Sequence, residues 1–299
     1  MNGPRTINVR SPLRVDFVGM TDYLPACRSF GGSIINATIN KYIYATAHPR
    51  ADGRFIFNAP DQGDLRVEVA CRDELDPAGE LSLAQQIARG FDLPGGVELT
   101  TYSQLPGGAG LGSSSTVATC IIAALNALTG WQLTAHQMAR RAIECETVAL
   151  HTTYGWQDQY SPVTGGGVKY MRHWPDGEGE AVEINEIPLT EAQIAALQRS
   201  MVVCYSGISR PAGSILHAVA EGFEDDRPEV IDALKGMSHV ADGMRLCLLE
   251  GRLDDAGAML SDVWELHKRL HPDVTNERIE ELYDVATRHG AIGGRVCGA

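Results

Sequence analysis

The sequence predicts an α+β fold, with a mixed sheet in its first half and a largely helical second half. Segments before residue 60 are rich in β-branched and aromatic residues, which is typical of strands. Apolar runs of helical spacing begin near residues 80 and 113. From about residue 212 to 290 the pattern is almost wholly helical, in three or four segments. We therefore expect two domains, residues 1–175 and 176–299, with the boundary near 170–180.

The individual elements follow from periodicity and from capping signals. Thr134 with Gln137, and Thr190 with Gln193, have the capping-box spacing that starts a helix. A weak hairpin signal is the DG turn within RADGRFIFNA, between strand-like flanks. Strands are expected at 7–19 (with a break at Pro12), 33–49 (one or two strands), 95–106, 165–174, 181–189 and 200–207, and helices at 80–91, 113–130, 133–151 and 190–199.

Composition limits the classes of protein. The 299 residues are 44% hydrophobic, which is enough for one large or two medium cores. No run of 18 apolar residues exists and the N-terminus lacks a signal-peptide core, so we expect no membrane span and a cytoplasmic protein. Seven scattered cysteines without a CxxC predict reduced thiols rather than disulfides or a zinc site.

The formal net charge of −13 argues against a general nucleic-acid-binding protein, because phosphate backbones need a basic face. It does not argue against a small anionic substrate. A pocket can be locally basic on an acidic protein, and glycine-rich backbone can bind phosphate without net charge. The sequence is compatible with a homodimer and does not set the oligomeric state.

The stretch LPGGAGLGSSST, residues 105–116, lies between a predicted strand and a predicted helix. This arrangement places backbone N–H groups and a helix N-terminus at one point, which suits an anion. A Walker A loop is excluded because no lysine follows, and a hydrolase elbow because GxSxG is absent. A Rossmann fingerprint needs GxGxxG and a later acid, and both are missing. A glycine-rich turn capped by serine remains an alternative.

Two further sites carry candidate chemistry. Glu144, Glu146 and Asp158 are carboxylates that could serve one magnesium ion and one general base, as phosphoryl transfer requires. Helical glutamates are usually solvated, whereas Asp158 lies in an uncharged, aromatic-flanked stretch.

Arg14, in a mostly apolar strand, could stabilise negative charge, with a surface strand arginine as the alternative. Thr21-Asp22 could bind sugar hydroxyls, although taken alone this pair is better explained by simple turn chemistry.

These three sites, in this order, resemble the GHMP small-molecule kinases, named for galactokinase, homoserine, mevalonate and phosphomevalonate kinases. PGGAGLGSSS is similar to the ATP-binding loop of that family. Within the family, the sequence resembles the D-glycero-D-manno-heptose 7-phosphate kinases. That likeness extends along the whole chain, in SFGGSIINATINKYIYA, GWQDQYSPVTGGG, YSGISR and VTNERIEELYDVATRHGAIGGRVCGA.

The resemblance implies a two-domain fold, with an N-terminal ribosomal S5-like mixed α/β domain and a C-terminal ferredoxin-like α+β domain with extra helices. It implies that ATP and the sugar bind between the domains. Asp158 matches the catalytic aspartate and Arg14 the basic residue that pairs with it, while Ser114 and Glu146 match the Mg²⁺ ligands. The resemblance assigns ATP binding to Gly107, Gly108, Ala109, Gly110, Leu111, Gly112, Ser113, Ser114 and Ser115.

The implied reaction is ATP-dependent phosphorylation of the anomeric C1 hydroxyl of a sugar phosphate, here heptose 7-phosphate giving the 1,7-bisphosphate. The alternatives are a galactokinase- or fucokinase-like enzyme acting on a free sugar, and a non-catalytic sugar-binding relative. Retention of Arg14, Ser114, Glu146 and Asp158 together argues against the last. The predicted substrate-binding residues are Thr21, Asp22, Gly31, Gly32, Arg28 and Arg210, with the two arginines as candidates for the substrate's own phosphate.

The sequence departs from the family pattern twice. Val18-Gly19-Met20 stands where heptose kinases of this type usually carry a glycine triplet, so a related sugar or another heptose isomer is a further alternative. The chain also ends at Val296–Ala299, inside the segment that resembles the third family motif, GAGGGG. We therefore expect weakened or absent activity for the chain as written unless a tail is restored.

Overall fold

The computed structural model describes residues 5–150, 155–175, 182–208 and 212–298. Contacts between residues divide the chain into two compact units, each made of several segments. The first unit comprises Met1–Arg14, Ile39–Gly107 and Gly112–Gly166, and the second comprises Val15–Thr38, Gly108–Leu111 and Gly167–Ala299. The predicted domains, residues 1–175 and 176–299, are continuous segments of sequence and stay a prediction.

Two long strands contribute to both units. They are β1 (Ile7–Val18) and β2 (Gly32–Pro49), which pair with each other. The segment predicted as one or two strands is thus a single one. Pro12 does not interrupt β1, because β1 pairs only with β2 among the described strands and a proline is tolerated on an edge strand.

In the first unit the strand order is β4-β3-β5-β2. The additional strands are β3 (Phe55–Ala59), β4 (Leu65–Val69) and β5 (Val97–Ser103). β5 pairs antiparallel with β2, from Ile43 opposite Ser103 to Pro49 opposite Val97, and pairs parallel with β3. β3 and β4 form the antiparallel pair at the end of this order.

The hairpin predicted around Asp52-Gly53 is wrong, because β5 lies between β2 and β3. The chain does turn there, but its backbone bonds to the segment before β5. Arg50 N donates to Gly96 O at 3.2 Å, and Gly53 N donates to Gly95 O at 3.0 Å. Gly96 has φ +79°, and a Cβ there would lie 2.0 Å from Arg54 O. Gly95 and Gly96 therefore allow the start of β5 to approach the turn closely, so that β5 lies between β2 and β3. A local turn signal does not reveal this arrangement.

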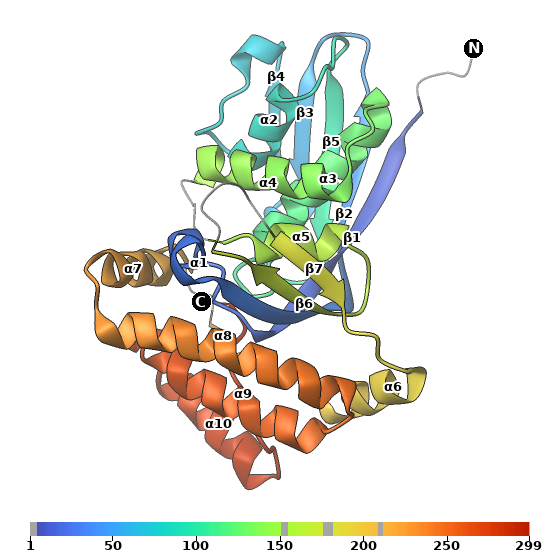
Figure 1. Cartoon of the computed structure of the whole chain (residues 1–299). Coiled ribbons are helices and arrows are strands. Elements are labelled where there is room, and N and C mark those ends of the chain that lie inside the picture. The colour runs from blue at the N-terminus through green and yellow to red at the C-terminus, as the bar shows by residue number, and fades with distance from the viewer. Residues whose placement is uncertain (1–4, 151–154, 176–181, 209–211, 299) are drawn as a thin grey trace. The chain divides into compact units, whose positions relative to one another are not determined.

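Helices pack against the sheet of the first unit, and Figure 1 shows α3 and α4 in front of β3 and β5. The α3 helix ends as predicted at Gly130, which has φ +75°. The predicted capping box before α4 is confirmed, since Thr134 N donates to Gln137 Oε1 and Gln137 N donates to Thr134 Oγ1. The helices of this unit are α2 (Ser82–Arg89), α3 (Ser113–Thr129), α4 (Ala135–Leu150) and α5 (Gln157–Val163).

In the second unit the start of β2 pairs antiparallel with β6, which pairs antiparallel with β7. The predicted helical stretch after residue 212 is confirmed and contains four α-helices, of which α8 and α9 lie side by side (Figure 1). The strands are β6 (Val168–His173) and β7 (Val182–Glu186), and the helices are α1 (Leu24–Phe30), α6 (Glu191–Ser200), α7 (Ala212–Glu224), α8 (Pro228–Leu249), α9 (Leu253–Lys268) and α10 (Glu277–Arg288).

The buried strand predicted at residues 200–207 is wrong. Residues 201–206 form neither helix nor strand, and no described strand pairs with them. Val202 is 91% exposed and Val203 is 56% exposed. An apolar run forms a buried strand only when another strand pairs with it and another layer packs on it. The described residues provide neither for residues 201–206.

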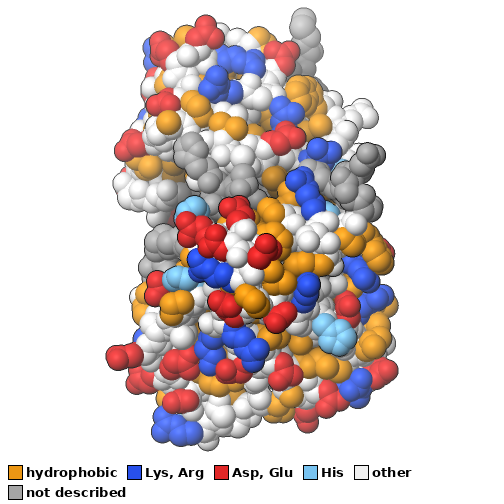
Figure 2. Space-filling view, turned by 60° about the vertical axis from the view of Figure 1, so that its left-hand side comes forward, with side chains coloured by type: hydrophobic (Ala, Val, Ile, Leu, Met, Phe, Trp, Pro, Cys, Tyr) orange, Lys and Arg blue, Asp and Glu red, His pale blue; other side chains and the backbone are white. Residues whose placement is uncertain are grey.

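Acidic and basic side chains are interspersed on the face seen in Figure 2. Many arginines pair with nearby carboxylates, such as Arg227 with Asp225 and Arg278 with Glu281. Burial raises the pKa of the Cys120 and Cys145 thiols to about 11, so these groups stay protonated at neutral pH. Within the described residues, every helix is too short or too polar to cross a membrane.

Candidate functional site

The glycine-rich loop before α3 requires glycine at alternate positions. Gly108, Gly110 and Gly112 have φ values of +73°, +74° and +70°, a region that other L-residues adopt only with strain. The helix starts at Ser113, and no described side chain caps its N-terminus. The alternative of a glycine-rich turn capped by serine is therefore wrong, because the three serines lie inside the first turn of the helix. The free N–H groups of that turn remain available to an anion.

Two of these serines bind one buried carboxylate. Ser114 Oγ and Ser115 Oγ donate to Glu146 Oε1 at 2.8 and 3.0 Å. Gln159 Nε2 donates to Glu146 Oε2 at 2.6 Å. Glu146 is only 4% exposed, and burial raises its pKa above the ordinary 4.5. The hydrogen bonds from Gln159 and the two serines oppose that rise by stabilising the ionised form.

The oxygen set formed by Ser114 and Glu146 fits a magnesium ion. Mg²⁺ prefers oxygen ligands and is usually held by one or two protein groups together with substrate phosphates. The described residues contain no group of three or more His, Cys, Asp or Glu suited to a metal, and magnesium held with a nucleotide does not need one. Ser113 Oγ is buried and forms no hydrogen bond with any described residue, so it is an unused polar group beside this set.

Arg14 and Asp158 form an ion pair in the first unit. Arg14 Nε donates a hydrogen bond to Asp158 Oδ1 at 2.8 Å, and Arg14 Nη2 lies 2.7 Å from the same oxygen. The Arg14 side chain is 3% exposed and that of Asp158 is 28% exposed. No described residue donates a hydrogen bond to Asp158 Oδ2, which leaves this oxygen able to accept one from a ligand.

Neighbouring structure fixes the position of Asp158. It lies in the first turn of α5, and its carboxylate packs on Gly112, where a Cβ would come 3.2 Å from the carboxyl carbon. Tyr160 anchors the same helix through a 2.8 Å hydrogen bond between its hydroxyl and His136 Nδ1. The carboxylate is thereby held at the end of the glycine-rich loop, next to the start of α3.

Gln159 was missed as a site residue, although it bonds both Glu146 and Ser115. It lies in the run Gln157-Asp158-Gln159, and the structure shows that both glutamines are buried. Glu144, by contrast, is exposed on α4, as expected of an ordinary helical glutamate.

In the second unit the structure brings together Thr21 and Gly32. Thr21 Oγ1 donates to Ser33 O at 2.7 Å, and Cys27 Sγ donates to Thr21 O at 3.0 Å. A Cβ on Gly32 would lie 2.2 Å from Thr21 O, so only glycine permits this approach. Asp22 is 9% exposed. The predicted sugar-binding role of these residues and of Gly31 stays a prediction.

The two arginines predicted to bind the substrate's phosphate have different outcomes. Arg28 is exposed in the last turn of α1. Arg210 lies outside the described residues.

The C-terminal segment of the second unit packs against the middle of the glycine loop. A Cβ on Gly110 would lie 2.2 Å from Cys297 O, so the two backbones are in direct contact. A buried ion pair between Arg295 Nη1 and Asp16 Oδ2, at 3.3 Å, holds this segment. Gly298 N also donates to Asp16 Oδ1 at 3.2 Å. Asp16 thus positions the segment that contacts Gly110.

Comparison with known proteins places this site in a family context. A model of the GHMP kinases N terminal domain matches residues 80–166, which include Ser114, Glu146 and Asp158. The chain is 29% identical over 301 residues to D-glycero-alpha-D-manno-heptose 7-phosphate kinase of Campylobacter jejuni, covering 99% of this chain and 87% of that protein.

A solved structure and a larger plant protein are also similar. The crystal structure of a D-glycero-D-manno-heptose 1-phosphate kinase from Bacteroides thetaiotaomicron superposes with a TM-score of 0.77 at 28% identity, covering 99% of this chain and 86% of that one. The bifunctional fucokinase/GDP-fucose pyrophosphorylase of Arabidopsis thaliana is 25% identical over 312 residues. That match covers 99% of this chain and 29% of the plant protein.

Proposed function

Since the chain belongs to the GHMP kinases, ATP-dependent enzymes that phosphorylate an alcohol group, we propose that it phosphorylates the anomeric C1 hydroxyl of a sugar phosphate. The family and its two-domain α+β fold, both predicted from the sequence, are confirmed by the relatives. The acceptor that we propose is D-glycero-D-manno-heptose 7-phosphate, with the 1,7-bisphosphate as product. The pair Arg14–Asp158 is the observation that carries the chemistry.

Asp158 is the proposed base. Its Oδ1 is held by a hydrogen bond from Arg14 Nε and by the ion-pair contact with Arg14 Nη2, so Oδ2 is the oxygen that accepts the proton of the attacking hydroxyl. An anomeric hydroxyl is more acidic than an ordinary alcohol, so a carboxylate is a suitable base for it. Arg14 keeps the carboxylate in one orientation, which lowers the entropic cost of reaching the reactive arrangement.

The first turn of α3 is the proposed site for the phosphates of ATP. Its free N–H groups and the unused Ser113 hydroxyl are donors for phosphate oxygens. Ser114 and Glu146 are the proposed protein ligands of magnesium, which when bound neutralises charge on the phosphates. Gln159 holds Glu146 in place through its 2.6 Å hydrogen bond.

The identity of the acceptor rests on the relatives. Two of them carry heptose phosphate kinase names, one as a 7-phosphate kinase and the other as a 1-phosphate kinase. Both names describe a kinase that acts on a phosphorylated heptose, and the first of them names the 7-phosphate that we propose. The 29% identity over nearly the whole chain supports the proposal but leaves the acceptor to experiment.

The test measures ADP release by the full-length protein with heptose 7-phosphate, hexose 6-phosphates and free hexoses, and locates the new phosphate by NMR. We expect the highest kcat/KM with heptose 7-phosphate and a C1 phosphate in the product. The Asp158→Asn variant serves as the control for catalysis by contaminating kinases. Preference for a free sugar, or a phosphate at another carbon, would overturn the proposed acceptor.

A free-sugar kinase is the second candidate, because a fucokinase-containing protein is also similar over 99% of this chain. The same panel decides between them when L-fucose and the free heptose are included. A kcat/KM for either that exceeds the value for heptose 7-phosphate favours the second candidate.

A further inference from the structure

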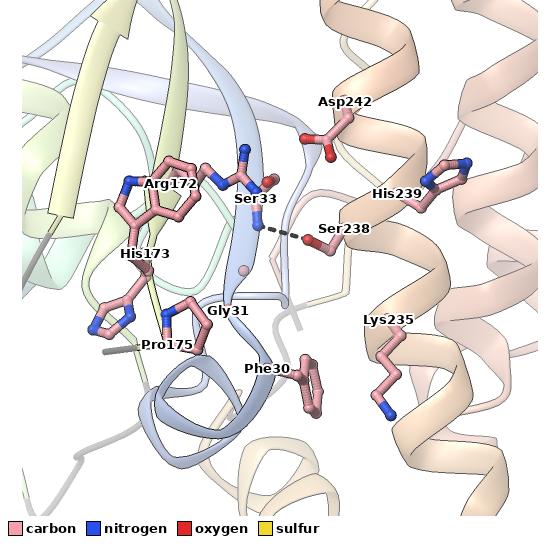
Figure 3. Close-up of a pocket in the computed structure, with 12 residues that line it drawn as sticks. Phe30, Gly31, Ser33, Arg172, His173, Pro175, Lys235, Ser238, His239 and Asp242 are labelled. Carbon is pink, nitrogen blue, oxygen red and sulfur yellow. Dashed lines mark hydrogen bonds between the residues drawn. The ribbon is translucent and has the colours of Figure 1, made fainter. Parts of the chain in front are cut away.

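The second unit contains a cavity of about 330 Å³, formed by the start of β2, the end of β6 and one face of α8 (Figure 3). This volume is at the lower end of the range found for small-molecule sites. Four of its side chains, Lys235, Ser238, His239 and Asp242, follow one another at the spacing of a single helix face. Arg172 of β6 faces them across the cavity.

The two permanent cations of this cavity contact aromatic rings, although Arg172 also has an acidic neighbour, Glu183, opposite it in the β6–β7 pairing. The Arg172 guanidinium lies 3.8 Å from the centroid of the Trp174 ring, and Lys235 Nζ lies 5.1 Å from that of Phe30. Neither forms an ion pair with any described carboxylate. Ring stacking holds a cation in position while its N–H groups remain free to donate.

This arrangement differs from that of many other arginines in the chain. Arg50, Arg227, Arg252 and Arg278 each pair with a carboxylate close in sequence. On a chain of net charge −13, two unpaired cations that line one cavity, with Asp242 as the single carboxylate there, form a local excess of positive charge. Such an excess attracts an anion.

The remaining polar groups of the cavity suit hydroxyls. Asp242 Oδ1 accepts a hydrogen bond from the Tyr170 hydroxyl at 2.6 Å, which fixes the carboxylate. Ser238 Oγ accepts one from Ser33 N at 2.9 Å and so retains its own proton for donation (Figure 3). The cavity therefore offers cations for a phosphate and a fixed carboxylate and hydroxyl for a polyol.

We propose that this cavity binds the phosphate-bearing end of the acceptor, with Arg172 and Lys235 on the phosphate and Asp242 and Ser238 on adjacent hydroxyls. The inference rests on the proposed function and names the residues that select a phosphorylated sugar. The planar Arg172 fork matches two phosphate oxygens, and Lys235 acts as a point charge. This role replaces the one predicted for Arg28, which does not line the cavity.

The experiment compares Arg172→Gln and Lys235→Gln with the wild-type enzyme, using heptose 7-phosphate and the free heptose as acceptors. The matched control is Arg245→Gln. It removes a positive charge from α8, the helix that carries Lys235, at a position about 15 Å from Lys235 along the helix axis. Arg245 stacks on Tyr170 and does not line the cavity. KM is measured for each acceptor and for ATP, and binding of heptose 7-phosphate without ATP is measured by calorimetry.

We expect each cavity variant to raise the KM and the Kd for heptose 7-phosphate by about 10- to 100-fold, as loss of a charge-assisted hydrogen bond implies. The KM for ATP, and kcat/KM for the free heptose, should change less than twofold, and Arg245→Gln should behave as the wild type. Lys235 is exposed, so its variant is expected to fold even if Arg172→Gln does not.

The outcomes separate the two proposals. If the wild-type enzyme uses heptose 7-phosphate and its KM is unchanged in both cavity variants, the cavity inference is wrong and the proposed function stands. If the variants raise the KM for ATP instead, the cavity binds nucleotide and the inference is also wrong. If the wild-type enzyme does not use any sugar phosphate, the proposed acceptor fails and the inference fails with it.

Discussion

Arg14 contacts a single oxygen of Asp158 twice, through a hydrogen bond from Nε at 2.8 Å and an ion-pair contact from Nη2 at 2.7 Å. The two residues are 144 positions apart, one in β1 and the other in α5. An arginine that binds a carboxylate through both oxygens would occupy the base completely. Here Oδ1 has the structural contact and Oδ2 is left for chemistry, so the two roles of Asp158 can be tested separately.

Substituting Asp158 by Asn should separate catalysis from stability. The Asn side-chain oxygen can still accept from Arg14, but the amide cannot take a proton, so kcat should fall by about 10²- to 10⁴-fold with little change in stability. Asp158→Ala removes the acceptor from the buried Arg14 guanidinium and should also lower the free energy of unfolding by about 1–3 kcal/mol. Steady-state kinetics and urea unfolding measure the two effects. An Asn variant that retains wild-type kcat would disprove the assignment of the base.

Substituting Glu146 by Gln should stabilise the protein at neutral pH while reducing its activity. Burial raises the pKa of Glu146 above 4.5, so the folded state binds this proton more tightly than the unfolded state. That contribution is fully present below about pH 4.5 and is lost as pH rises through the raised pKa. Above it, the wild-type chain carries an ionised, desolvated carboxylate that the Gln variant lacks.

The measurement is urea unfolding of both proteins at several pH values between 4 and 8. The free energy of unfolding of the Gln variant, relative to the wild type, should increase with pH across this window, and kcat/KM should fall by about 10²- to 10³-fold through loss of a charged ligand. The control is Gln137→Glu, which also exchanges an amide and a carboxylate in α4. The Gln137 side chain is at an exposed position, where it accepts a hydrogen bond from Thr134 N. A stability difference that does not vary with pH would mean that Glu146 keeps an ordinary pKa.

Some residues of the first unit's candidate site carry a chemical signal of their own, whereas Glu146 follows only from the family resemblance. A carboxylate in an uncharged stretch, an arginine in an apolar strand and serines after a glycine loop are each unusual where they stand. Arg14 with Asp158, and Ser114 with Glu146, do contact each other in the structure. Gln159 could not be predicted, because an amide next to a catalytic aspartate looks like ordinary helix polarity until its neighbour Glu146 is known.

The features that failed are those that depend on a partner distant in sequence. The DG turn at Asp52-Gly53 indicates a hairpin, yet β5 enters between the two flanking strands. The apolar run containing Val202 indicates a strand, yet no described strand pairs with it. Likewise, the spacing of Lys235 and Asp242 places them on one helix face, but the sequence does not show that Arg172 lies opposite.

When the Met20 side chain is removed, the glycine variant should be more stable than the alanine variant. Met20 has φ +69° although it is 6% exposed. Both Met20→Gly and Met20→Ala lose the buried side chain, but only glycine adopts this φ without strain. Met20→Gly should therefore be more stable than Met20→Ala by about 1 kcal/mol in urea unfolding. The control is Ala26→Gly, at a buried position in α1. It should lower the stability, because glycine is less favourable than alanine inside a helix. Met20→Ala as the more stable variant would show that the strain is absent.

Gly110 should be essential to ATP binding and Gly107 should not, although both belong to the same loop. Gly110 has φ +74°, and a Cβ there would lie 2.2 Å from Cys297 O, so alanine must displace either the loop or the C-terminal segment. Gly107 has no heavy atom within 4 Å of the corresponding position. If the loop supplies backbone N–H groups to the phosphates as we propose, displacement should raise the KM and the Kd for ATP in Gly110→Ala by at least about 10-fold. Gly107→Ala should stay within about twofold of the wild type. Calorimetry with ATP and initial-rate kinetics measure both, and equal effects of the two substitutions would mean that contact with Cys297 does not hold the loop in its binding conformation.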